Sequence, residues 1–291
     1  MIVAVVVFAL EILTNMGFVA QLEDNKFNMT VAAASRGSSK PFSKQLLHSV
    51  LVIGHKGNSS EAPENTLAAI KEAFALGVGM VEVDVYLSRD GVPVVMHDET
   101  VDRTTNGKGL VAEMTLAQLK TLDAGSWMHL KYSDQRIPTL TEALQAAKGK
   151  GPLFIDLFVD GLGRPVAQIL KRLKLPDSSV VIGAWSTTQV IDFVRYVPRA
   201  KIMMTSSEAP KEWDADYFKK QRNSGITGFE IQADKLPAAF VTDAHAHGMP
   251  VYAFTVNDVP TMRRLIEMGV DGIETDVPRV MIRVVKDISR R

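Results

Sequence analysis

Cysteine is absent from the 291 residues of this chain. Disulfides, thiolate nucleophiles and zinc sites built on cysteine are therefore all excluded. The chain also has no excess of charge of either sign, since 33 Lys and Arg residues balance 33 Asp and Glu residues. A neutral chain offers no general electrostatic attraction to nucleic acid, so we expect no nucleic-acid partner. Overall neutrality still allows a local cluster of acidic residues.

Basic residues are missing from the start of the chain, where no Lys or Arg precedes Lys26. The positively charged beginning of a standard signal peptide is therefore lacking, and Glu11 interrupts the apolar run, which is costly within a membrane span. Residues 1–20 are interpreted as a degenerate export signal or membrane anchor. The alternatives are a wrongly assigned first residue of the protein or a frayed apolar helix. We expect an exported, periplasmic or membrane-anchored protein rather than a cytoplasmic one.

Residues 21–47 are polar, rich in Ser and Lys, and broken by Gly37 and Pro41, as is typical of a linker or arm. From there on, over 48–288, short apolar runs alternate with amphipathic stretches, which favours one mainly parallel sheet. The strand-like runs are 50–54, 80–86, 92–97, 152–157, 180–184, 201–204, 228–232, 251–255 and 272–275. Helix-like stretches between them include 65–77, 166–173 and 260–269.

One connection between these runs is too short for a parallel crossover. Only residues 87–91 separate the second run from the third, whereas a crossover needs about a dozen residues. Asp90-Gly91 is also a strong hairpin signal, so 92–97 is expected to fold back antiparallel on 80–86. Eight parallel strands then remain, which predicts a TIM-type (β/α)8 barrel with a small insertion after the segment that ends at His97. A doubly wound open sheet is the alternative, but no Gly-rich phosphate loop follows the first strand.

Two carboxylates share one face of the second strand. Because side chains alternate along a strand, Glu82 and Asp84 point to one side while Val81, Val83 and Val85 point to the other. On the inner face of a barrel, two carboxylates repel each other unless a cation lies between them. Ca²⁺ and Mg²⁺ prefer such oxygen ligands. The pair therefore indicates a cation site, and two solvated acids on an exposed strand are the alternative.

Histidines end two of the strand-like runs. A turn centred on Arg89-Asp90 would place His97 opposite position 82 or very near it. His55 follows the first strand, and the carboxyl ends of the strands form the catalytic face of a barrel. Either histidine alone would more often be structural. Two that converge on one pair of acids favour a catalytic role.

A further acid, Asp156, interrupts the apolar run 152–157. Burial of an unpaired carboxylate is expensive, so Asp156 needs a partner. We interpret it as a third ligand of the same cation, with a salt-bridged structural aspartate as the alternative.

Long stretches of the chain resemble the glycerophosphodiester phosphodiesterase family. The opening signature of that family is similar to IGHKGNSSEAPENTLAAIKEA (53–73) and to VEVDVYLSRDGVPVVMHDETVDRTTNGKG (81–109). Its closing strands are similar to YAFTVND (252–258) and GVDGIETDVP (269–278). The resemblance implies that His55 and His97 are the catalytic pair. It also implies that Glu82, Asp84 and Asp156 bind one divalent cation, Ca²⁺ or Mg²⁺.

The resemblance further implies that Lys56 and Glu64 bind the substrate. Lys56 stands where the family usually has Arg, which keeps the positive charge but loses the bidentate fork suited to phosphate. Phe158 stands where family members commonly have Lys. A cationic contact to phosphate is therefore either lost here or supplied by another residue.

These observations predict metal-dependent hydrolysis of small-molecule glycerophosphodiesters to glycerol-3-phosphate and an alcohol, with one histidine as base and the other as acid. A related lipid phosphodiesterase, similar to the spider-venom phospholipase D family and acting on lysophospholipid or sphingolipid, is the nearest alternative. The motif Pro63-Glu64-Asn65-Thr66 favours the first reading. A barrel that binds phosphodiesters without turnover is the alternative from another class. Membrane association through residues 1–20 is a further expectation.

Overall fold

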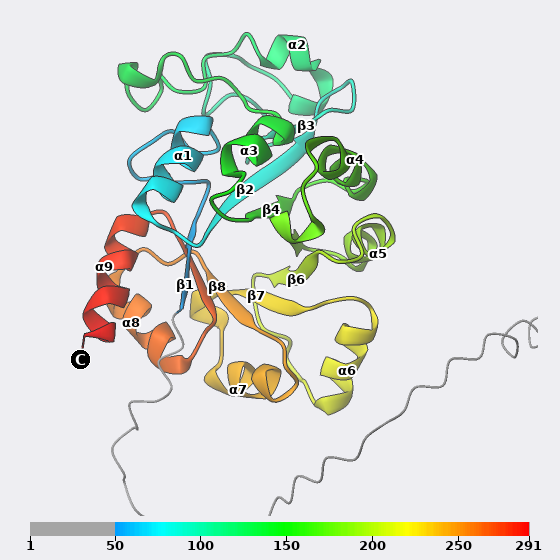
Figure 1. Cartoon of the computed structure of the whole chain (residues 1–291), viewed down its shortest axis with the longest axis vertical. Coiled ribbons are helices and arrows are strands. Elements are labelled where there is room, and N and C mark those ends of the chain that lie inside the picture. The colour runs from blue at the N-terminus through cyan, green and yellow to red at the C-terminus, as the bar shows by residue number, and fades with distance from the viewer. Residues whose placement is uncertain (1–49, 291) are drawn as a thin grey trace, which may run out of the picture. The chain divides into compact units, whose positions relative to one another are not determined.

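The computed structural model describes residues 50–290, and their strands close into a parallel barrel (Figure 1). The interpretations of residues 1–20 and 21–47 lie outside the described residues, as do the first two residues of the predicted domain 48–288. Within the described range, no helix combines the length and the apolar character that a membrane crossing needs.

Nine strands form a single sheet. They are β1 Leu51–Gly54, β2 Met80–Leu87, β3 Pro93–Val95, β4 Leu153–Leu157, β5 Val180–Ala184, β6 Lys201–Ser206, β7 Gly228–Gln232, β8 Val251–Phe254 and β9 Gly272–Thr275. The sheet order is β1-β9-β8-β7-β6-β5-β4-β2-β3, and a further parallel pairing of β1 with β2 closes the ring. Eight strands are parallel, and β3 alone runs antiparallel, on β2. The predicted barrel and its antiparallel excursion are confirmed.

Helices surround the ring of strands (Figure 1). They are α1 Leu67–Leu76, α2 Leu116–Leu119, α3 Leu140–Ala147, α4 Gly163–Leu173, α5 Thr187–Tyr196, α6 Ala215–Asn223, α7 Ala238–Ala246, α8 Val259–Met268 and α9 Pro278–Ser289. Many begin at a residue whose side chain accepts a hydrogen bond from the first turn, for example Thr66, Ser186 and Asp258. Such caps satisfy backbone N–H groups that have no partner within the helix.

The β2–β3 hairpin has nearly the predicted register. Val85 pairs with Val95, and continuation of that register places position 97 opposite Val83. The strand ends at Val95, however, so His97 follows it rather than belonging to it. The insertion 96–139 comes next and has a small core of its own. It contains α2 and two short 3₁₀ helices, Val111–Glu113 and Leu130–Tyr132.

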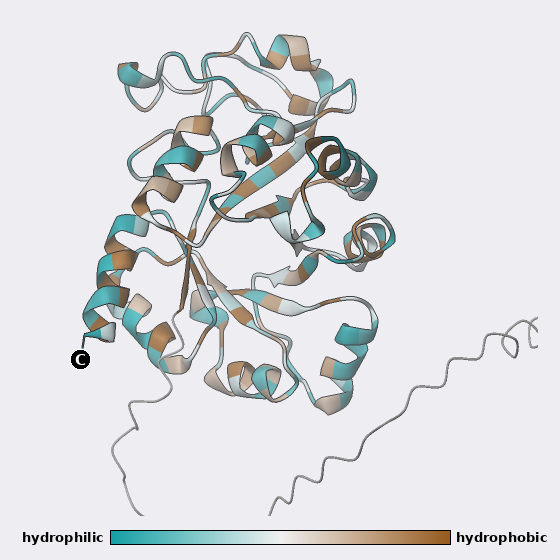
Figure 2. Ribbon diagram, viewed as in Figure 1, coloured by the Kyte–Doolittle hydropathy of each residue, from teal (hydrophilic) through white to brown (hydrophobic). Residues whose placement is uncertain are grey.

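The barrel interior is apolar at one end and acidic at the other. Hydrophobic and hydrophilic residues alternate along β2, as its bands of colour show (Figure 2). The valines of β2 are buried against the helices, whereas Met80, Glu82 and Asp84 point into the barrel. An apolar plug fills the amino-terminal end of the barrel, where Met80 packs with Phe154 and Tyr252 among others. The inward charged side chains of the same strands lie nearer the carboxyl-terminal end, which is the catalytic face of this fold.

The loop from β1 to α1 carries His55, Lys56 and Glu64, and its path depends on glycine. Gly57 has a φ of 93°, and a Cβ atom there would lie 2.5 Å from the carbonyl carbon of Ala69. Only glycine fits such a close approach between two backbones. The loop is closed by the N–H of Asn65, which donates to the carbonyl of Lys56 at 3.0 Å. Both flanks of the loop are thereby held over the barrel mouth.

Candidate active site

Three carboxylates meet at the carboxyl ends of β2 and β4. The register pairs Asp84 with Asp156 across the two strands, and Glu82 lies one inward position earlier. One oxygen from each of Glu82, Asp84 and Asp156 lies within 4.8 Å of the other two. The structure thus brings the three predicted cation ligands together, and Glu82 and Asp84 are buried.

The chemistry of this cluster fits a hard divalent cation. Glu82 accepts a hydrogen bond from the Lys56 N–H at 2.7 Å through Oε2, whereas its buried Oε1 has no partner among the described residues. Burial, followed by the charges of Asp84 and Asp156, raises the pKa of Glu82 well above its usual value. Burial likewise raises the pKa of Asp156. A cation between the three groups would satisfy the orphaned oxygen and remove the repulsion.

Asn65, which the sequence analysis did not single out, fixes the orientation of Asp84. Its side-chain amide donates to Asp84 Oδ2 at 2.6 Å, and its carbonyl oxygen accepts the Asp84 N–H at 3.2 Å. Asn65 has a φ of 58°, a conformation that asparagine tolerates better than most residues. The motif Pro63-Glu64-Asn65-Thr66 could have predicted this contact, because the side-chain amide of an asparagine in a tight loop can donate to a carboxylate.

Two further buried acids were also missed. Glu230 on β7 and Glu274 on β9 are nearly inaccessible, and each has one oxygen without a hydrogen-bond partner among the described residues. Thr205 donates its hydroxyl to Glu230 at 3.0 Å, and burial raises the pKa of Glu230 to about 7. Burial also raises the pKa of Glu274. Each is a single acid between apolar neighbours, which is a weaker sequence signal than the Glu-Val-Asp pair of β2.

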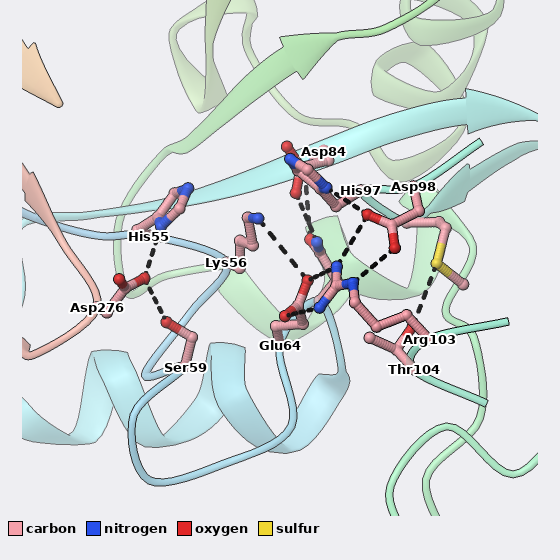
Figure 3. Close-up of polar contacts among 12 residues, drawn as sticks. His55, Lys56, Ser59, Glu64, Asp84, His97, Asp98, Arg103, Thr104 and Asp276 are labelled. Atoms are coloured by element: carbon pink, nitrogen blue, oxygen red, sulfur yellow. Dashed lines mark hydrogen bonds and ion pairs between the residues drawn. The ribbon is translucent and has the colours of Figure 1, made fainter. Parts of the chain in front are cut away.

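His55 is joined to an aspartate on the last strand connection. Its Nδ1 lies 2.6 Å from Asp276 Oδ1 (Figure 3). Its Nε2 lies 3.5 Å from Glu274 Oε1. Asp276 also accepts hydrogen bonds from the Ser59 hydroxyl at 2.9 Å and the Asn257 amide at 2.6 Å. Burial alone would raise the pKa of Asp276, but the hydrogen bond with His55 and the other donors hold it at about 2. Asp276 is therefore a permanent anion beside the imidazole.

His97 has a matching aspartate, which is its neighbour in sequence. Its Nδ1 lies 2.6 Å from Asp98 Oδ1, and its ring lies edge-on to Phe158 with centroids 5.2 Å apart. Hydrogen bonds from Arg103 lower the pKa of Asp98 to about 2, against the effect of partial burial. The two predicted histidines thus share one arrangement, an imidazole with Nδ1 on an ionised aspartate. In both, the aspartate occupies only Nδ1, so Nε2 is the nitrogen that can face a substrate.

Arg103 connects His97 to the two predicted substrate-binding residues (Figure 3). Its Nε donates to Asp98 at 2.6 Å, and its two Nη atoms donate to Glu64 at 2.8 Å each. Glu64 in turn lies 3.7 Å from Lys56 Nζ. All seven predicted site residues therefore belong to one connected group, although their roles remain predictions.

The buried acids make the stability of the cation-free protein depend on pH. A carboxyl with a folded-state pKa near 7 keeps its proton after the unfolded chain, with a pKa near 4.5, has lost it. We expect the free energy of unfolding to fall between about pH 5 and about pH 7.5, with Glu230 contributing on the order of 3 kcal/mol. Asp98 and Asp276 titrate below this window. Urea unfolding after EDTA treatment measures the effect.

The variant Glu230→Gln is the matched control for that measurement, because it keeps an oxygen for the Thr205 hydroxyl but cannot ionise. It should lose less stability over the same pH interval than the wild type. A wild-type stability that is constant or rises from pH 5 to pH 7.5 would contradict the raised pKa values.

Known proteins are similar to this chain in sequence. Residues 55–280 match the Glycerophosphoryl diester phosphodiesterase family. A glycerophosphodiester phosphodiesterase of Caldanaerobacter subterraneus subsp. tengcongensis is 34% identical over 243 residues, which are 81% of this chain and 98% of the relative. Glycerophosphodiester phosphodiesterase 1 of Rattus norvegicus is 48% identical over 97 residues, which are 33% of this chain and 29% of that protein.

A solved structure is similar over most of the chain. It is that of an Oleispira antarctica phosphodiesterase in complex with the product sn-glycerol-3-phosphate. The identity is 31% and the TM-score 0.74, and the similarity covers 81% of this chain and 96% of the other. With a family match over most of its length and a relative of 34% identity, the chain belongs to the glycerophosphoryl diester phosphodiesterase family.

Proposed function

We propose that this protein hydrolyses glycerophosphodiesters to glycerol-3-phosphate and an alcohol. The observation that carries the proposal is the pair of aspartate-bound histidines beside the three-carboxylate cluster, with Nδ1–Oδ1 distances of 2.6 Å at both His55 and His97. Membership of the family supports the reaction class. The glycerol-3-phosphate product in the Oleispira antarctica structure supports the substrate class.

In this proposal Glu82, Asp84 and Asp156 hold one divalent cation, Ca²⁺ or Mg²⁺. When bound, the ion supplies positive charge to a phosphate oxygen. The protein orients two of these ligands with the Lys56 N–H on Glu82 and the Asn65 amide on Asp84. Both contacts use one oxygen of each carboxylate and leave the other oxygen available.

The histidines are proposed to act as acid and base. An aspartate on Nδ1 holds the ring and favours the tautomer with its lone pair on Nε2. One Nε2 accepts the proton of the nucleophile, and the other imidazole gives a proton to the oxygen of the leaving alcohol. The nucleophile is either water or the hydroxyl of the substrate's own glycerol, which would give a cyclic phosphate that water then opens.

Lys56 is proposed to supply a positive charge to the phosphate. Its side chain is largely buried, and Glu64 lies close enough to orient its ammonium group. Lys56 would thus take the part of the Arg that the family usually has at this position. Glu64 itself is held by two hydrogen bonds from Arg103, so its role in substrate binding is to fix Lys56.

An apolar ring at position 158 also favours a second candidate, hydrolysis of a lysophospholipid to release its alcohol. Phe158 stacks on Tyr86 and contacts His97, so an apolar surface borders the catalytic centre.

Export or membrane association through residues 1–20 stays a separate proposal, supported by the apolar composition of that segment.

The reaction is tested by glycerol-3-phosphate release from glycerophosphocholine. We expect release to stop in EDTA, because the three carboxylates then lose the cation that balances their charge. Release should return when Ca²⁺ or Mg²⁺ is added. His55→Ala should reduce kcat by at least about 10²-fold, the usual contribution of a positioned acid or base. His245→Ala is the matched control, because His245 also pairs with an aspartate, Asp271 at 2.7 Å, but on α7.

Activity in His245→Ala should equal that of the wild type. Release that survives both EDTA and His55→Ala would reject the mechanism. No release from glycerophosphocholine under any condition, with release from a lysophospholipid, would select the second candidate.

The variant Arg103→Lys tests whether Arg103 positions His97. Replacement by Lys keeps the charge but cannot hold Asp98 and Glu64 with one planar group, so kcat should fall by about tenfold or more. Arg279→Lys is the matched control, since Arg279 also donates two hydrogen bonds to one carboxylate, that of Glu61, and is equally exposed, at 48% against 47%. Exposed ion pairs add little stability, so both variants should unfold near the wild-type temperature. Equal activities of the two variants would refute the positioning role.

A further inference from the structure

Three aromatic side chains border the acidic cluster on the side of β4, β5 and β8. We call Phe158, Trp185 and Phe254 the aromatic collar. The Trp185 indole N–H donates to Asp156 Oδ1 at 2.6 Å, and its ring meets that of Phe254 edge-on with centroids 6.0 Å apart. Phe158 touches the His97 ring. A group that leaves the reaction centre on this side therefore meets apolar surface.

A cleft of about 300 Å³ opens beside the collar, between the ends of β6 and β7, the following loop and α6. Trp185 is the side chain that links the two, because it lines the cleft and also bonds Asp156. The other apolar walls of the cleft include Met204, Ala209, Tyr217, Phe229 and Ile231. Trp185 is 42% exposed, which is unusual for so large an apolar side chain.

Two hydroxyl groups of the cleft are already engaged. The Thr205 hydroxyl donates to Glu230, and the Ser206 hydroxyl donates to the carbonyl of Glu208. Glu208 and Lys211 also line the cleft, and both are exposed, so their charged groups can stay in water. Seven of the eleven lining residues are apolar, so a ligand in this cleft finds mainly apolar contacts.

A second cleft, on the other side of the collar, has a different character. It has a volume of about 460 Å³ and is lined by Phe254 together with the charged residues Asp234, Asp258 and Arg264. Only three of its nine lining residues are apolar, against seven of the eleven that line the cleft beside Trp185. Of the two clefts, the one beside Trp185 is the better host for an apolar group.

We propose that the cleft beside Trp185 is the subsite for the leaving alcohol and that it takes an alkyl or acyl chain. The inference rests on the proposed function and specifies which phosphodiesters the enzyme prefers. Each methylene that moves from water into the cleft should improve binding by up to about fourfold. The gain should appear mainly in KM, because the contact lies away from the reacting atoms.

The test uses glycerophosphodiesters of methanol, butanol and hexanol, with glycerophosphocholine as the polar reference. For the wild type, kcat/KM should rise from the methyl to the hexyl ester. Ala209→Phe fills the cleft and should erase this rise, so that kcat/KM becomes nearly the same for the three esters. Ala239→Phe adds the same ring at an exposed position of α7 and should leave the whole series unchanged.

Met204→Ala is the second variant, for the case that Ala209→Phe does not fold. It enlarges the cleft and should weaken the gain in kcat/KM per methylene. A flat series in the wild type, or a rise that persists in both cleft variants, would overturn the subsite. Failure to release glycerol-3-phosphate from any ester, glycerophosphocholine included, would instead reject the proposed function, and the subsite with it.

Discussion

Repulsion among five carboxylates at one end of the barrel is the constraint on which the rest of the site depends. Glu82, Asp84, Asp156, Glu230 and Glu274 all project from inward positions of the strands, and several retain oxygens without partners in the described part of the chain. Burial raises the pKa of four of them, so the fold holds them together at a cost in stability. Such a cost is expected where a protein stores binding energy for a cation and a phosphate.

The two histidines receive the same support from different surroundings. Asp98, beside His97, is also held by the guanidinium of Arg103, whereas Asp276, beside His55, is also held by the neutral donors Ser59 and Asn257. Both aspartates stay ionised and fix the imidazole through Nδ1. The barrel mouth is therefore divided into an acidic centre, two oriented histidines and an aromatic collar on the side of β4, β5 and β8.

Local sequence patterns predicted much of this architecture because they depend on neighbours in the chain. The Glu-Val-Asp alternation of β2 and the short 87–91 connection gave the inward acids and the hairpin, and the structure agrees with both. Contacts that form only when the barrel closes could not be predicted from local sequence patterns. His55 meets Asp276 across 221 positions because β1 pairs with β9, and no local pattern encodes that pairing. Glu230 and Glu274 were missed because a single acid in an apolar strand shows its direction only once the register is known.

The pH dependence of kcat for glycerophosphocholine tests the two-histidine account most directly. If one imidazole must be neutral and the other protonated, the profile is bell-shaped, and each limb reports one of the pair. The account predicts such a bell between about pH 5 and about pH 9 for the cation-saturated enzyme. A rate that is flat across this range would contradict acid–base catalysis by His55 and His97.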